Sequence, residues 1–163
     1  MKKAILVTVL ASTVSSAAAA DYVGFFVGGT MGGFGGGLHY QQDVGSASAM
    51  RYALTGLGLS NGYFNIGGEF AYLNDLSAAN GFGPLQPYYG LGLGAGVTLG
   101  NASAVGLYPH VLGGLRYNVA TTPLSVFGEV NLGPSIVFAS AGSSSGVGVS
   151  FGLGGRLGIN YRL

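Results

Sequence analysis

The chain has 163 residues, enough for one domain, and only 7% of them are charged, against about 25% in a typical soluble domain. It contains 33 glycines and no cysteine, which disfavours long helices, disulfides and thiolate chemistry. The glycines follow no G-X-Y period, so a collagen-like helix is excluded.

The first element along the chain is a secretory signal peptide over residues 1–20. Two lysines precede a short apolar run, Ile5 to Val14, and the alanines Ala18 to Ala20 provide an A-x-A type cleavage site. We therefore expect the mature chain to be residues 21–163. That part has four arginines against five acidic residues, a formal net charge of −1, and it has no lysine. A chain of this charge is a poor partner for nucleic acid.

After the leader no run of about 20 apolar residues follows, so no membrane-spanning helix is expected. Apolar and small residues instead alternate with a period of two, which is typical of strands with two different faces. This alternation predicts eight strands: 22–33, 37–45, 49–59, 63–73, 88–100, 104–119, 124–138 and 146–163. The alternation breaks at Leu57 and Leu59, which predicts a bulge near Gly56 or Gly58.

Strands of about 10 residues or more match bilayer-spanning barrels, whereas strands in soluble proteins average about 5–6 residues. Two classes of closed barrel share this alternation, and they place their apolar faces on opposite sides of the wall. A soluble, lipocalin-like barrel turns its charged face to water, whereas a membrane barrel turns its apolar face to lipid. The polar face here is mostly glycine, serine and asparagine, too sparsely charged for an outer surface. The favoured fold is an all-β, eight-stranded antiparallel up-and-down transmembrane β-barrel over residues 21–163.

The lumen of an eight-stranded barrel is only just wide enough for side chains. Glycine rows in the fifth and eighth strands are expected to leave room for inward rings: Tyr22, Phe26, Tyr63, Tyr88, Tyr108 and Phe127. Counting back from the last hairpin places Glu129 opposite Arg156, with Arg116 near the same level. Because isolated charges in a narrow lumen must be paired, we predict a lumen charge cluster of these three residues. Arg51 and Glu69, diagonal across the hairpin of the third and fourth strands, form a second predicted lumen pair.

The remaining polar residues carry no recognisable catalytic pattern. His39 and His110 are expected on the lumen face, without a nucleophile motif or a metal-ligand spacing. The glycine stretches 28–37 and 90–96 have no βαβ context for nucleotide binding. We therefore predict no catalytic residue, cofactor or metal. Four tyrosines near strand ends on the expected lipid face are predicted interfacial aromatics: Tyr72, Tyr89, Tyr117 and Tyr161.

The signal peptide, the alternating strands and the C-terminal "GRLGINYRL" (155–163) resemble small outer-membrane barrels of the OmpA/OmpX type. "PYYGLGLGAGV" (87–97) resembles the strand after a periplasmic turn in that family, and "GLRYNVATTPLSVFGEVNLG" (114–133) resembles its last periplasmic hairpin. The resemblance implies that both termini are periplasmic. It also implies that the final strand carries an assembly signal read by the outer-membrane insertion machinery. The matching positions are Leu157, Ile159, Tyr161 and Leu163, the last standing where an aromatic residue is typical.

In that orientation the outer connections, near 34–36, 60–62, 100–103 and 139–145, are all short, and the longest connection, 74–87, is periplasmic. The chain then offers little to the outside. We expect a non-enzymatic protein of the cell outer membrane, in contact with outer-membrane lipids. Its expected role is structural, either envelope stabilisation or an accessory subunit of a larger envelope or surface-layer complex. A narrow channel for small solutes or ions is the main alternative. A lumen enzyme using a histidine and a soluble ligand-binding barrel are the others.

Overall fold

The computed structural model describes residues 20–30, 33–60, 63–76, 82–99, 103–141 and 144–163. The predicted signal peptide therefore lies outside the described residues, apart from Ala20. Among the residues described, no helix is long and apolar enough to cross a membrane.

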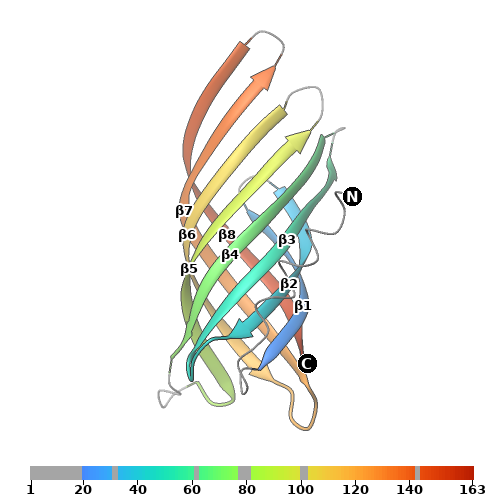
Figure 1. Cartoon of the computed structure of the whole chain (residues 1–163), viewed down its shortest axis with the longest axis vertical. Helices are drawn as coiled ribbons and strands as arrows, with labels where there is room; N and C mark the ends of the chain where they lie inside the picture. Colours follow the sequence, from blue (N-terminus) through green and yellow to red (C-terminus); the bar gives the residue numbers. More distant parts are fainter. Residues whose placement is uncertain (1–19, 31–32, 61–62, 77–81, 100–102, 142–143) are drawn as a thin grey trace, which may run out of the picture.

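Eight antiparallel strands form a closed barrel in which each strand pairs with its neighbours in sequence and β1 pairs with β8 (Figure 1). The strands are β1 (Asp21–Thr30), β2 (Gly33–Asp43), β3 (Ser48–Ser60), β4 (Tyr63–Asp75), β5 (Leu85–Leu99), β6 (Ser103–Asn118), β7 (Leu124–Ala141) and β8 (Ser144–Arg162). This topology confirms the predicted all-β, eight-stranded antiparallel barrel. We call the end that carries Asp21 and Leu163 the terminal end, and the opposite end the far end.

Two details of the strand boundaries follow from local pairing. The register of β3 with β4 shifts between Leu57 and Ser60, which confirms the bulge predicted there. The first connection at the far end lies between Thr30 and Gly33 and not at 34–36, because the glycines of that stretch continue the ladder with β1. The glycines at 35–37 are therefore part of a strand, and Gly37 lies against the inward ring of Phe26.

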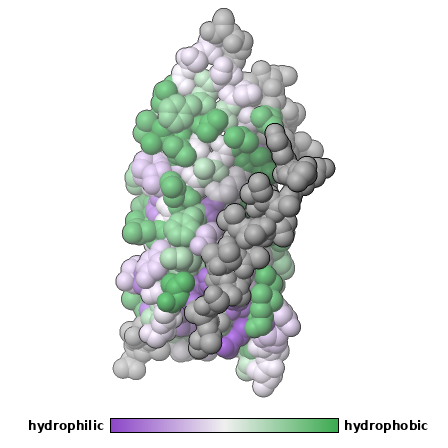
Figure 2. All heavy atoms as spheres, in the orientation of Figure 1, coloured by the Kyte–Doolittle hydropathy of each residue, from purple (hydrophilic) through white to green (hydrophobic). Residues whose placement is uncertain are grey.

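The two faces of each strand separate as the alternation predicts. On β1, Phe25 is 51% exposed on the outer surface, whereas Phe26 points into the lumen and is 7% exposed. Apolar side chains of the other strands cover the outer surface in the same way, and Figure 2 shows them spread over the visible wall. The most buried polar and charged side chains, in contrast, come from the inward positions. The barrel is thus apolar outside and polar inside.

Inward rings are packed against glycines on the neighbouring strand. The cross-strand partners are His39 with Gly24, Phe26 with Gly37, Tyr88 with Gly114, His110 with Gly92 and Phe127 with Gly158. In each pair a Cβ on the glycine would approach the ring to 2.6 Å or less. Glycines therefore make room for lumen rings. Of these five glycines, Gly92 on β5 and Gly158 on β8 belong to the rows that the sequence predicts, and the other three lie on β1, β2 and β6. The side chain of Tyr63 lies outside the described set.

The wall of the barrel differs in height around its circumference. β1 and β2 have 10 and 11 residues, whereas β7 and β8 have 18 and 19. At about 3.3 Å per residue and a tilt of about 40°, this difference corresponds to roughly 20 Å of extra height. The β7–β8 hairpin accordingly rises far above the β1–β2 hairpin at the far end (Figure 1).

Candidate functional site

Four charged side chains from opposite walls of the barrel meet in the middle of the lumen. Arg51 on β3 and Glu69 on β4 come from one wall, and Glu129 on β7 and Arg156 on β8 come from the other. Arg51 Nη1 lies 2.9 Å from Glu129 Oε2, and its Nη2 lies 3.5 Å from Glu69 Oε1. Arg156 Nη2 lies 2.8 Å from Glu69 Oε1 and 2.5 Å from Glu129 Oε1. Each arginine therefore contacts both glutamates, and we call these four residues the charge network.

The charge network is buried and balanced. The exposed fractions of its side chains are 3% for Arg51, 10% for Glu69, 0% for Glu129 and 6% for Arg156. Two positive and two negative groups leave the network without net charge, which is the arrangement that burial of ions requires. The Tyr88 hydroxyl adds a hydrogen bond to Glu129 Oε2 at 3.0 Å.

The structure brings together residues that the sequence placed in two separate groups. Glu129 lies opposite Arg156 in the ladder, and Arg51 contacts Glu69 diagonally across the β3–β4 hairpin. The two contacts between opposite walls, Arg51 with Glu129 and Arg156 with Glu69, were not anticipated. They join both predicted groups into a single network.

Arg116 was predicted in this cluster, and its placement is a correction. The residue of β6 opposite Glu129 is Gly114, so Arg116 lies two residues closer to the terminal end. There Arg116 Nη2 bonds Asp75 Oδ1 at 2.9 Å, and Gln86 donates to the other oxygen of Asp75 at 3.0 Å. Asp75 belongs to β4, although the sequence placed it in a connection. Arg116, Asp75 and Gln86 thus form a second polar group nearer the terminal end.

His39 is held by a neutral partner, whereas His110 also borders the charge network, with its Nε2 3.8 Å from Glu69 Oε2. His39 Nε2 donates to Asn160 Oδ1 at 2.6 Å, and His110 Nδ1 donates to the backbone carbonyl of Tyr108 at 2.9 Å. The His110 ring also stacks on the Tyr108 ring, with 4.7 Å between their centroids. Within the described ranges, no group of three or more His, Cys, Asp or Glu side chains is arranged to hold a metal ion. These contacts are those of histidines that pack in the lumen.

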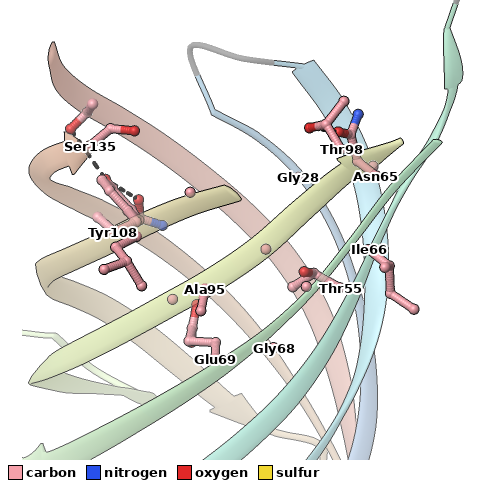
Figure 3. Close-up of a pocket in the computed structure, with 18 of the residues that line it drawn as sticks. Gly28, Thr55, Asn65, Ile66, Gly68, Glu69, Ala95, Thr98, Tyr108 and Ser135 are labelled. Carbon is pink, nitrogen blue, oxygen red and sulfur yellow. Dashed lines mark hydrogen bonds between the residues drawn. The ribbon is translucent and has the colours of Figure 1, made fainter. Parts of the chain in front are cut away.

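A cavity of about 530 Å³ occupies the lumen between the charge network and the far end. Glu69 lies at its lower end in Figure 3, with Thr55, Asn65 and Thr98 above it. On the opposite side, Tyr108 donates a hydrogen bond to Asn131 Oδ1 at 2.9 Å. Glycines supply much of the remaining wall, and the charged residues among the described lining residues are those of the charge network. The lining is therefore mostly glycine and apolar side chains with a few polar groups, and Glu69 and Arg156 form the floor of the cavity.

The predicted interfacial tyrosines all lie exposed on the outer surface: Tyr72, Tyr89, Tyr117 and Tyr161. They lie in the half of their strands next to the terminal end. The positions of the predicted assembly signal alternate along the same end of β8, with Leu157 and Leu163 strongly exposed. This placement is compatible with both roles, which stay predictions.

The sequence matches no protein-family model and no curated protein. Among solved structures, the chain is similar to the N-terminal β-barrel domain of Pseudomonas aeruginosa OprF, with a TM-score of 0.60 and 10% identity over 88% of this chain and 97% of that one. A major outer membrane protein from Thermus thermophilus gives a TM-score of 0.48 and 16% identity over 90% and 100% of the two chains. Neisserial surface protein A gives 0.45 and 16% over 89% and 96%.

The closed barrel and its likeness to the OprF domain define the class of the fold. The protein is a closed eight-stranded antiparallel barrel of the kind found in bacterial outer-membrane proteins. At such low sequence identity the likeness extends to architecture and not to activity.

Proposed function

We propose that the protein is a non-enzymatic barrel of the cell outer membrane with a structural role and a sealed lumen. The observation that carries this proposal is the charge network, whose side chains reach from both walls and meet in the centre. A barrel that transports nothing can still serve the envelope by occupying and bracing the membrane.

The burial of the charge network supports a sealed lumen. A path wide enough for water would expose the side chains that line it, yet Arg51 and Glu129 are 3% and 0% exposed. Closer to the terminal end, Leu73, Tyr88 and Leu112 pack together in a buried apolar cluster. An ion entering from the cavity would therefore have to break buried ion pairs before it reached the other side.

The distribution of side chains supports placement in a bilayer. The closed barrel satisfies its ladder hydrogen bonds internally, as hydrocarbon requires, and its outer wall is apolar. Water would meet a large contiguous apolar surface if the barrel were soluble, and such surfaces are rare on soluble monomers. We further propose that the four outward tyrosines mark the lipid–water boundary at the terminal end.

Substituting Val130→Arg tests this placement. Val130 is exposed on the outer wall in the middle of β7, so an arginine there is expected to lower the free energy of unfolding by about 2–4 kcal/mol in lipid vesicles. Ala120→Arg, in the exposed turn before β7, is the matched control and should change it by less than about 0.5 kcal/mol. Urea titration of both variants gives the comparison. Equal, small effects would mean that the wall meets water.

Cell fractionation and liposome swelling test the proposal as a whole. We expect the protein in the outer-membrane fraction, released by detergent and not by salt. Proteoliposomes that contain it should shrink in sucrose or arabinose without re-swelling. Re-swelling at a rate that scales with the amount of protein would favour the channel alternative, and recovery without detergent would favour a soluble barrel.

A further inference from the structure

Among the described residues, the upper half of β8 has a neighbouring strand on one side alone. The ladder between β1 and β8 ends at the pair Thr30 and Gly154, because β1 is short. The ladder between β7 and β8 continues to the pair Ala141 and Ser144. Residues 144–153 of β8 thus form an edge that faces the space above β1 (Figure 1).

The register fixes which backbone groups face this open edge. Leu163 N–H donates to Asp21 on the β1 side, and Arg162 N–H donates to Pro123 on the β7 side. Since the pairing of β8 shows no shift along its length, all odd-numbered residues turn their N–H and C=O groups to the β1 side. Above Gly154 these groups face no strand of the described barrel.

The side chains of the same odd-numbered residues point outward and are apolar. They are among the most exposed large apolar groups in the structure: Val147 at 65%, Val149 at 71%, Phe151 at 62% and Leu153 at 59%. The inward positions between them, from Ser144 to Ser150, are also exposed. β7 stays paired with β6 up to Ser140, so the upper part of β8 is the open edge of a sheet that continues through β7 and β6.

Neither lipid nor water suits this edge. The outward apolar row of β7 from Leu124 to Phe138 spans roughly 35 Å at the usual rise and tilt, more than the band of about 25 Å that lipid covers. If the edge lies in hydrocarbon, its backbone groups lack partners. If it lies in water, its apolar row is exposed. An additional strand removes both problems, because it supplies hydrogen-bond partners for the backbone groups of the edge and also covers its apolar side chains.

A second copy of this chain does not fit the edge. Two barrels in one membrane are related by an axis along the membrane normal, so both β8 strands run in the same vertical direction. Because each is tilted by about 40° in the same sense, the two strands would cross and could not align. Antiparallel alignment would require an axis in the membrane plane, which would turn one barrel upside down.

We propose that the edge 145–153 of β8 pairs with an extended segment of a different, larger envelope protein, which continues the sheet in line with β1. This inference deepens the accessory-subunit role and rests on the membrane placement proposed above. The existing β1–β8 ladder fixes the direction of the new strand, antiparallel to β8. The segment would alternate, with apolar residues beside Val149 and Phe151. Its inward residues can be large beside Gly148 and Ser150, which are exposed, and a Cβ on Gly148 would meet no heavy atom within 4 Å.

Val149→Pro is the decisive variant. Proline removes the N–H that faces the open edge and leaves the ladder with β7 intact, so the barrel should still fold. Val149→Ala also removes the bulk of the valine side chain but keeps the N–H, and it is the matched control. The native mass of each protein is measured after extraction from its own outer membrane in mild detergent, with heat-modifiable migration as the check of folding.

We expect wild type and Val149→Ala to migrate in a particle larger than one chain plus detergent, and at least roughly 80% of Val149→Pro to migrate as a single barrel, about a fivefold loss of the assembled form. The proposal is overturned if Val149→Pro stays assembled, if wild type migrates alone, or if the particle contains copies of this chain alone. Wild type that is alone but in the membrane removes this inference and leaves the structural barrel standing.

Amide exchange covers the case in which the proline variant fails to fold. In the native particle, the odd-numbered amides from Val147 to Leu153 should exchange slowly, and they should exchange at least roughly tenfold faster once the barrel is isolated. The even-numbered amides, bonded to β7, serve as the internal control. Fast exchange of the odd-numbered amides in both samples would overturn the proposal.

Discussion

Replacing Glu129 with glutamine is expected to lower the free energy of unfolding by about 3–5 kcal/mol. Glu129 is fully buried and neutralises part of the charge of both Arg51 and Arg156. Glutamine keeps the shape of the side chain but removes its charge, so a buried guanidinium is left without compensation. Urea titration of the protein refolded into vesicles measures the loss, with an unchanged slope as the sign of an unchanged barrel.

Asp75→Asn is the control for this result. Asp75 also accepts a hydrogen bond from a lumen arginine, Arg116, but its side chain is 24% exposed. Water therefore compensates the loss of charge, and the expected change is no more than about 1 kcal/mol. Equal losses for the two variants would contradict the idea that the buried charge network stabilises the barrel more than other lumen charges do.

Replacing Gly158 with alanine is expected to lower the free energy of unfolding by about 1–3 kcal/mol. A Cβ at this position would lie 2.5 Å from two ring atoms of Phe127 and 2.6 Å from the carbonyl oxygen of Phe25. The ring could turn away, but the carbonyl belongs to the neighbouring strand and cannot move without disturbing the ladder. Heat-modifiable migration and urea titration both report the loss.

Gly106→Ala separates this steric effect from a general effect of glycine. Gly106 borders the cavity, and a Cβ there meets no heavy atom within 4 Å. The stability should stay the same or rise by up to about 1 kcal/mol, because alanine restricts the unfolded chain. A loss at Gly106 as large as the loss at Gly158 would show that the ring–glycine pairs are not the reason for the glycine content.

The sequence was sufficient to predict the strands and their two faces. A period of two assigns Phe25 to the outer surface and Phe26 to the lumen without any knowledge of tertiary structure. The same alternation predicts hairpin registers, because consecutive strands pair directly. That is why Glu129 opposite Arg156 could be derived by counting from the last hairpin.

Contacts across the lumen could not be derived in this way. Whether Arg51 on β3 meets Glu129 on β7 depends on the stagger accumulated over the strands between them, and a period of two carries no information on stagger. The misplacement of Arg116 has a different origin. It is an error of two residues in the register of the β6–β7 hairpin, and an even shift keeps the side chain on the predicted face but moves it to another level. Asp75 was missed because Asn74 and Asp75 are residue types common in turns, yet here they extend the ladder of β4.

The current through single barrels in a planar lipid bilayer tests the sealed lumen most directly. The folded protein is inserted at low density in concentrated potassium chloride, with a known porin as positive control for insertion. The charge network predicts a membrane that stays silent apart from baseline noise while the protein is shown to be folded and inserted. Uniform, steady conductance steps from the wild-type barrel would contradict a sealed lumen and make the protein a channel.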